Sequence, residues 1–293
     1  MNRHVLRALV LALAIFPAAR IAEALPQGAA IDLVPHRAIY DMTLKKAVAG
    51  SNVSEIRGRL VFDFAGSACD GYSLKSRLVT ELIDREGNAT VTDLRSTTWE
   101  QADGGKFRFN SAQYVDQRLS ERLEGSAARR KANEAIDVTI DKPQRQALNF
   151  RGTPLFPTQH SLAILEAAQQ GTNMVQADIY DGSEKGNKLL STTTVIGRPS
   201  LPGPRAHPAG MKNFERLDEL VSWPVSISYY ETPAEANRDE GLPTYELSFR
   251  LFANGVSRDL LIDYGNFSIH GELSRIDFYP PAACPGPAAV KKK

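Results

Sequence analysis

Strict alternation of apolar and polar residues is the feature that most constrains the fold of this chain. Across residues 245–251 every second side chain is apolar, and the side chains between them are polar. A period of two is typical of a β-strand with one buried face, because successive side chains point to opposite faces. Similar rows occur at residues 38–44 and 60–64. The pattern predicts an all-β fold.

Turn dipeptides separate these rows. Asn254-Gly255 follows the row at residues 245–251, and Asp-Gly pairs stand at residues 70–71, 103–104 and 181–182. Such pairs adopt the positive φ angles that tight hairpin turns require. Further along the chain the apolar spacing shifts near Ser274, which predicts a β-bulge. Strands at this density, joined by such turns, indicate one large antiparallel sheet.

A large sheet must cover its apolar face, and it does so by curling into an open barrel or spiral, or by splitting into a sandwich. One segment, residues 158–170, has a helical composition, with Thr158 as the expected N-cap and Gly171 as the expected end. Leu162 and Leu165 belong to the apolar residues that leave little of this helix polar. We therefore expect it to be buried, as a plug inside a curled sheet.

The N-terminus predicts export. A basic start and an apolar run at residues 8–16 precede Ala22 and Ala24, the small side chains that signal peptidase requires. We predict a cleaved signal peptide at residues 1–24. A membrane anchor is the alternative, but Arg20 interrupts the run before it reaches the ~20 residues that span a bilayer. Without a cysteine near the cleavage site for a lipid anchor, the mature chain is expected in the periplasm.

The mature chain, residues 25–293, is predicted to form a single domain. Its Pro-rich stretch at residues 198–209 is interpreted as a long surface loop, because both flanks share the same period; a domain boundary is the alternative. The tail at residues 280–293 is also Pro-rich. Loss of the signal peptide removes three arginines and one glutamate, so the formal net charge moves from +1 to −1. A nearly neutral chain lacks the basic footprint of a nucleic-acid-binding protein.

The mature chain contains two cysteines, Cys69 and Cys284. An even number of cysteines in an oxidising compartment indicates a disulfide, and we predict that these two are bonded. The bond would close a loop of about 200 residues, which restricts the unfolded chain by roughly 5 kcal/mol in the chain-entropy model. Cys284 lies in a Pro-rich segment that suits neither a helix nor an inner strand. The bond is therefore expected to fix the tail.

The sequence contains no recognisable enzyme active site. It lacks the G-x-S-x-G and H-E-x-x-H motifs and any phosphate-binding glycine loop. Asp178, Asp181 and Glu184 suit a calcium loop, but a strand that ends in an Asp-Gly turn explains them better. Each histidine of the mature chain is expected to be structural rather than a ligand or a base; these are the scattered His36, His160, His207 and His270. We predict no catalytic residue, no metal and no cofactor.

Seven sequence blocks follow one another along the mature chain: AIYDMTL (38–44), GRLVFDF (58–64), GSACDGY (66–72), STTWE (96–100), LFPTQH (155–160), YDGS (180–183) and NGV (254–256). Together they resemble the envelope integrity protein B family of Gram-negative bacteria, and the cysteine and Phe-Pro-Thr-x-His blocks are the most specific. The resemblance implies a monomeric periplasmic protein with a spiral, open-barrel sheet, similar to the carriers that move lipoproteins between the two membranes. It also implies a disulfide, which maps onto Cys69 and Cys284.

The resemblance further implies a role in cell-envelope integrity and division, a link to a periplasmic tetratricopeptide-repeat protein, and no enzymatic activity. Two hypotheses follow. In the first, the concave face of the sheet binds an elongated apolar envelope molecule, a lipid or a lipoprotein chain. In the second, the interior is filled and the sheet is a scaffold for a protein partner. An apolar groove of several hundred Å³ would favour the first, with four aromatic candidates for its lining: Tyr40, Phe62, Phe249 and Phe267.

Overall fold

The N-terminal half of the chain is a meander of eight strands. The computed structural model describes residues 31–130, 135–204, 207, 213–231 and 241–281. In the first half the strands are β1 (His36–Ala47), β2 (Val53–Ser67), β3 (Gly71–Asp84), β4 (Ala89–Glu100), β5 (Lys106–Val115), β6 (Arg118–Arg129), β7 (Ile136–Lys142) and β8 (Gln146–Phe150). Each of these strands pairs with the next one along the chain, in antiparallel orientation.

The second half of the chain adds six strands to the same sheet. They are β9 (Met174–Ile179), β10 (Leu190–Ile196), β11 (Ser222–Glu231), β12 (Tyr245–Phe252), β13 (Ser257–Asp263) and β14 (Phe267–Phe278). These strands also pair antiparallel in sequence order, and β14 then pairs with β1. The described residues thus form one fourteen-stranded sheet with β8 and β9 at its two edges.

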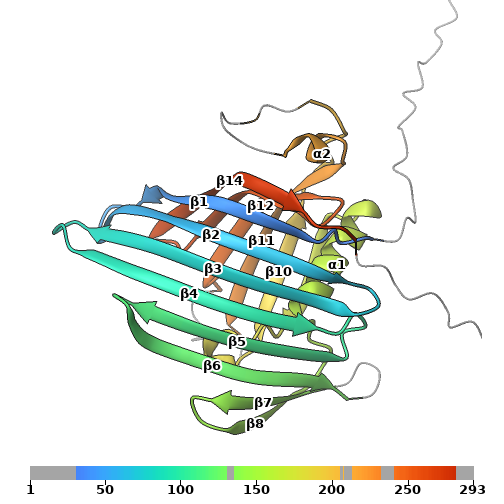
Figure 1. Ribbon diagram of the computed structural model, residues 1–293, viewed down its shortest axis with the longest axis horizontal. Coiled ribbons are helices and arrows are strands. Elements are labelled where there is room, and N and C mark those ends of the chain that lie inside the picture. Colours follow the sequence, from blue (N-terminus) through green and yellow to red (C-terminus); the bar gives the residue numbers. More distant parts are fainter. Residues whose placement is uncertain (1–30, 131–134, 205–206, 208–212, 232–240, 282–293) are drawn as a thin grey trace, which may run out of the picture.

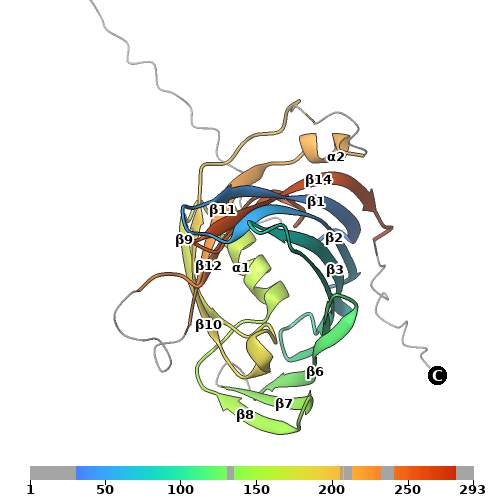
Figure 2. The same ribbon diagram turned by 90° about the vertical axis from the view of Figure 1, so that its left-hand side faces the viewer.

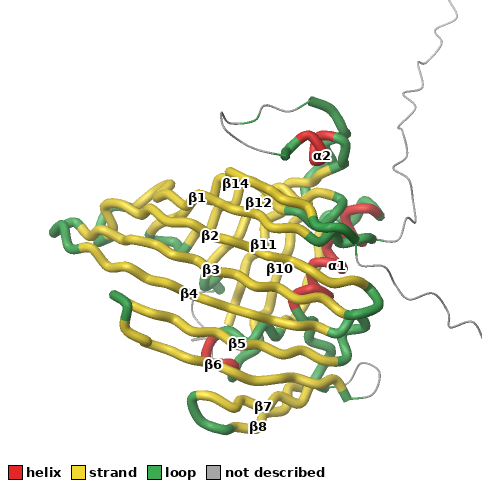
Figure 3. The backbone as a smooth tube through the Cα atoms, in the orientation of Figure 1, coloured by secondary structure: helices red, strands yellow, loops and turns green. Residues whose placement is uncertain are grey.

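The sheet curls on itself without closing, because β8 and β9 do not pair with each other. Figure 1 shows the strands lying obliquely side by side, and Figure 2 shows them curving around a central helix. The predicted all-β fold, with a large antiparallel sheet curled into an open barrel, is confirmed. Figure 3 shows how few of the described residues are helical.

The central helix is α1 (Pro157–Gln169), which lies in the chain between the two edge strands. Its buried residues include Leu165, which is fully buried, and it packs on β9 and β10 from inside the curl. The expected plug is confirmed. The other helical segments are short: η1 (Glu184–Gly186) and α2 (Glu215–Asp218). Within the described ranges, no helix has both the length and the apolar character that a bilayer crossing needs.

The predicted N-cap of α1 is wrong. The cap is Phe156, whose side chain makes no capping hydrogen bond, and the helix begins at Pro157. Proline is favoured at the first helical position, which moves the start one residue ahead of Thr158. The free N–H groups of Thr158 and Gln159 instead donate to the carboxylate of Glu100 on β4, at 2.7 and 2.9 Å.

The predicted end, bulge and turn agree with the structure. Gly171 follows the helix with a φ of +74°, in the left-handed region that glycine favours. Ser274 is the unpaired residue of a bulge, because Ile39 pairs with Arg275 and the next residue of β1 pairs with Leu273. Between β12 and β13, Gly255 has a φ of +85°, as expected of the Asn-Gly turn.

Several predictions lie wholly or partly outside the described residues. These are the signal peptide at residues 1–24, Cys284 and most of the tail at residues 280–293, so the disulfide and export stay predictions. Cys69 lies in the exposed turn between β2 and β3. The Pro-rich segment at residues 198–209 links β10 to β11, two strands that pair directly with each other. The domain boundaries also stay a prediction.

Candidate functional site

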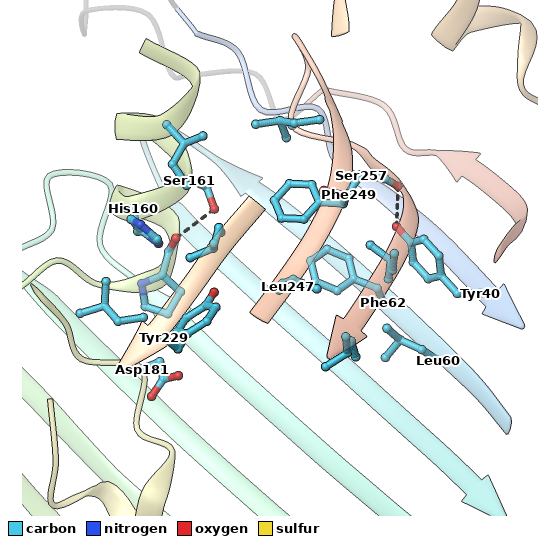
Figure 4. Close-up of a pocket in the computed structure, with 18 of the residues that line it drawn as sticks. Tyr40, Leu60, Phe62, His160, Ser161, Asp181, Tyr229, Leu247, Phe249 and Ser257 are labelled. Atoms are coloured by element: carbon cyan, nitrogen blue, oxygen red, sulfur yellow. Dashed lines mark hydrogen bonds between the residues drawn. The ribbon is translucent and has the colours of Figure 1, made fainter. Parts of the chain in front are cut away.

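A cavity of about 370 Å³ lies between α1 and the inner face of the sheet. We call it the inner cavity; Figure 4 shows its lining. Most of its wall comes from alternate residues of β1, β2, β11, β12 and β13. The aliphatic part of this wall includes Leu60, Ile227, Leu247, Leu251, Leu260 and Ile262, and α1 adds Ile164.

Strand register places the aromatic residues on this wall. Tyr40 pairs with Leu60, and Phe62 pairs with Ala38 two residues away, so all four side chains share the inner face. Phe249 stands between Leu247 and Leu251 on the same face of β12. The structure therefore places Tyr40, Phe62 and Phe249 on the cavity wall, as predicted.

The prediction that Phe267 belongs to the lining is wrong. Phe267 is the first residue of β14 and pairs with Ala47, the last residue of β1. Its ring packs on Tyr264 at 5.0 Å between ring centroids. Phe267 thus lies at the opposite end of the strand from the Ser274 bulge and outside the set of residues that line the inner cavity.

Polar side chains gather at one end of the inner cavity. Figure 4 shows His160 on α1 and Asp181 after β9 near Tyr229 on β11, and all three residues line the cavity. Burial lowers the pKa of His160 to about 4, so its imidazole is neutral at neutral pH. Burial, with a smaller contribution from the Asp181 carboxylate, raises the pKa of the Tyr229 phenol. This end therefore carries two neutral polar groups beside one anion.

A second cavity, of about 220 Å³, adjoins the first. Both are lined by His36, Phe62, Pro157, Ser161 and Gly255. Nδ1 of His36 lies 2.7 Å from the carbonyl oxygen of Val34, and its ring stacks on Phe62 at 5.9 Å. Burial lowers the pKa of His36, which favours its neutral form. The interior thus continues past His36 toward the start of α1.

Sequence reasoning missed the polar end of the cavity. His160 and Asp181 stand apart in the chain, and the packing of α1 on β9 brings them to one wall. A signal was nevertheless present, because His160 ends the Phe-Pro-Thr-x-His block and Asp181 lies in the Tyr-Asp-Gly-Ser block. Tyr229 gave no signal beyond its place in an alternating strand.

The Asp-Gly turn accounts for Asp181, one of the acidic residues near Gly182. Asp181 accepts a hydrogen bond from the backbone N–H of Ser183 at 2.8 Å, which closes the turn. Asp178 instead accepts from the Ser191 hydroxyl across the β9–β10 pair. In the ranges that the structure describes, no three His, Cys, Asp or Glu side chains converge on a possible metal position.

The two remaining histidines lie away from the inner cavity. Nε2 of His207 is 2.9 Å from a carboxylate oxygen of Asp218 at the end of α2. His270 on β14 lines a groove of about 540 Å³, together with Val195, Pro224 and Leu261. We call this the outer groove, because Pro224 and Leu261 alternate along β11 and β13 with residues that line the inner cavity. Val195 and His270 share this outer face through their cross-strand pairs. Neither histidine joins His36 and His160.

Comparison with known proteins agrees with the geometry. The cell envelope integrity protein EipB of Brucella abortus (strain 2308) is 36% identical over 266 residues, which cover 90% of this chain and 91% of that protein. The crystal structure of a β-barrel-like protein of a domain of unknown function from Brucella abortus matches with a TM-score of 0.77 and 36% identity. The match covers 86% of this chain and all of that one. The family model described as EipB-like matches residues 27–280, so the chain belongs to the EipB-like family.

Proposed function

We propose that this chain is a non-enzymatic, monomeric periplasmic protein that supports cell-envelope integrity and division by holding an elongated apolar envelope molecule in the inner cavity. The similarity to a protein named for cell envelope integrity supports the cellular role. The predicted signal peptide supports the compartment.

The observation that carries the ligand proposal is the unfilled space between α1 and the sheet. Ligand pockets typically measure about 300 to 1,000 Å³ and are lined mainly by apolar and aromatic side chains. The inner cavity, at about 370 Å³, has such a lining, including Phe62, Leu247 and Phe249. Its continuation past His36 lengthens the space that a chain-like molecule would occupy. A lipid or the acyl chain of a lipoprotein matches this shape and chemistry.

The test is a titration of delipidated protein with the neutral fluorescent probe N-phenyl-1-naphthylamine. We expect saturable binding to the wild type and its loss in Leu247→Trp, which fills the inner cavity. Leu261→Trp is the matched control, because Leu261 lies on the opposite face of the sheet and lines the outer groove. Absence of saturable binding to the wild type, or equal binding to both variants, would contradict the proposal.

The alternative is a scaffold that docks a protein partner, such as a periplasmic tetratricopeptide-repeat protein. The outer groove favours this alternative, because it exposes Val195, which is 53% exposed, beside Pro224 and Leu261. Apolar groups exposed together mark interaction surfaces. A scaffold would lose envelope function in cells through Val195→Arg on the outer groove and keep it in Leu247→Trp. The ligand-binding role predicts the reverse.

A further inference from the structure

Two tyrosines on the wall of the inner cavity differ in how their hydroxyls are satisfied. The Tyr40 hydroxyl donates to the carbonyl oxygen of Ser257 at 2.8 Å. Tyr229 is only 8% exposed and stacks on Tyr245 at 4.4 Å, yet its hydroxyl has no hydrogen-bond partner among the described residues. The hydroxyl is not enclosed by protein atoms, and Tyr229 lines the cavity. It is therefore available to hydrogen-bond a ligand at the polar end of the cavity.

His160 adds a second unused polar atom there. Its Nε2 lies 3.4 Å from the Thr192 hydroxyl, which itself donates to the carbonyl oxygen of Ala177 at 2.8 Å. Thr192 can thus only accept from His160, which puts the proton on Nε2 and leaves a lone pair on Nδ1. With its pKa lowered by burial to about 4, His160 stays neutral at neutral pH. It offers an acceptor to a ligand.

Asp181 gives this end of the cavity a negative charge. One carboxylate oxygen accepts from the Ser183 backbone N–H, and the other has no hydrogen-bond partner within the described residues. The described residues that line the cavity include no lysine or arginine. A ligand with an anionic head would meet a like charge in a site partly shielded from water, which is unfavourable.

We propose that the ligand is an amphiphile with an uncharged, hydrogen-bond-donating head, such as a hydroxyl or an amide. The head lies between Asp181, Tyr229 and His160, and the chain runs toward Phe249 and Phe62. Asp181 and His160 can accept a hydrogen bond from the donor group of the head, and the Tyr229 hydroxyl can donate one to the oxygen of the head. A cationic head is disfavoured, because it would lose its hydration on entering the cavity. The attraction of a single carboxylate beside two neutral groups does not offset that loss. This inference rests on the proposed function, since it assigns the polarity of the molecule in the same cavity.

The experiment measures displacement of N-phenyl-1-naphthylamine by dodecanol, dodecylamine and dodecanoate at neutral pH. Dodecanol is kept below its solubility limit, and the two charged compounds are kept below their micelle concentrations. We expect dodecanol to bind about tenfold or more tightly than dodecanoate. Dodecanol is also the more apolar compound, so the readout is the change of this ratio in variants. Asp181→Asn should bring dodecanoate to within about threefold of dodecanol, because the like charge is gone.

Two further variants locate the effect. Asp178→Asn removes the same charge from the nearby strand β9, where Asp178 is exposed and bonded to Ser191, so it should leave the ratio unchanged. Tyr229→Phe should weaken dodecanol severalfold while the binding of the probe itself stays the same, because only the hydroxyl is lost.

The failures of the two proposals are distinguishable. Absence of saturable probe binding to the wild type would overturn both the proposal of an apolar ligand and this inference. Saturable probe binding with the same dodecanol-to-dodecanoate ratio in wild type and Asp181→Asn would overturn only the assignment of the head. Tighter binding of dodecylamine than of dodecanol would replace the uncharged head with a cationic one and so contradict the inference.

Discussion

Two sets of cross-strand partners, each running from β3 across the strands that follow it, lie on the inner face of the sheet. We call each set a row, and the two rows differ in how far they are buried. Near α1 the row runs through cross-strand partners on β3, β4, β5 and β6 that are all buried: Tyr72, Glu100, Phe107 and Ala127. Nearer the opposite end the row passes through Leu78 and Gln113, which are half-buried, and Leu94, which is 36% exposed.

The difference comes from what covers each row. In the first row, Glu100 accepts from the start of α1, and Phe107 stacks on Phe156, the residue before the helix, at 5.1 Å. A helix of thirteen residues is about 20 Å long, so it covers only one end of these strands. Alternation along a strand therefore marks which face is apolar, whereas the covering element decides how much of that face is buried.

The largest expected effect compares two identical substitutions. Leu165→Ala on α1 removes a fully buried side chain and should lower the free energy of unfolding by about 2–5 kcal/mol. Leu94→Ala at the open row should cost about 1 kcal/mol or less, because Leu94 is 36% exposed and already contacts water. Urea denaturation of both variants measures the two values. Similar costs would mean that α1 does not account for the difference between the rows.

The second effect concerns the predicted disulfide. Its residue Cys69 lies in the turn just before Tyr72, which belongs to the buried row near α1. Cys69→Ser should lower the free energy of unfolding by about 2–4 kcal/mol and the melting temperature by several degrees. Cys284→Ser should have the same effect, and the double variant should cost no more than either single variant, because both changes break the same bond. Non-reducing peptide mapping checks the bond directly; two alkylated thiols would disprove the pairing.

The alternating pattern was enough to predict the strands, their antiparallel sheet and the bulge at Ser274, because these depend on local spacing and on one apolar face. It left a curled sheet and a sandwich open, and the family resemblance indicated the curl. The buried helix also followed from its own composition. The site did not follow, because two long-range features build it. The packing of α1 on β9 places His160 and Asp181 on one wall, and the pairing of β14 with β1 brings the β1–β2 and β11–β13 walls of the cavity together. Phe267 was misplaced because alternation gives the face of a strand but not how far along the strand the cavity extends.

The third effect is a dependence of stability on pH. Burial holds the pKa of His160 at about 4 in the folded state, against about 6.5 in the unfolded chain, so only the unfolded state gains the proton between these values. Stability should therefore fall as pH drops from about 6.5 to about 4, by up to about 3 kcal/mol from this residue. Denaturant titrations across this range should show a smaller fall for His160→Gln.

Other groups act in the same pH range, so the variant is compared with the wild type at each pH. Burial lowers the pKa of His36, which adds to the loss of stability in acid. Burial raises the pKa of Glu100, which acts in the opposite direction, because the folded state then binds the proton more readily. An unchanged pH profile in His160→Gln would show that this imidazole is not buried in its neutral form.

The smallest effect separates two assignments for the start of α1. Sequence alone favours Thr158 as the N-cap, whereas in the structure Glu100 accepts hydrogen bonds from the N–H groups of Thr158 and Gln159. Glu100→Ala should lower the free energy of unfolding by about 1–2 kcal/mol, the usual cost of losing a capping side chain. Thr158→Ala should cost about 0.5 kcal/mol or less, because its side chain is not the cap. Thermal denaturation ranks the two variants. If Thr158→Ala proved the more damaging, the helix would be anchored by its own first turn, and the buried row near α1 would not depend on β4.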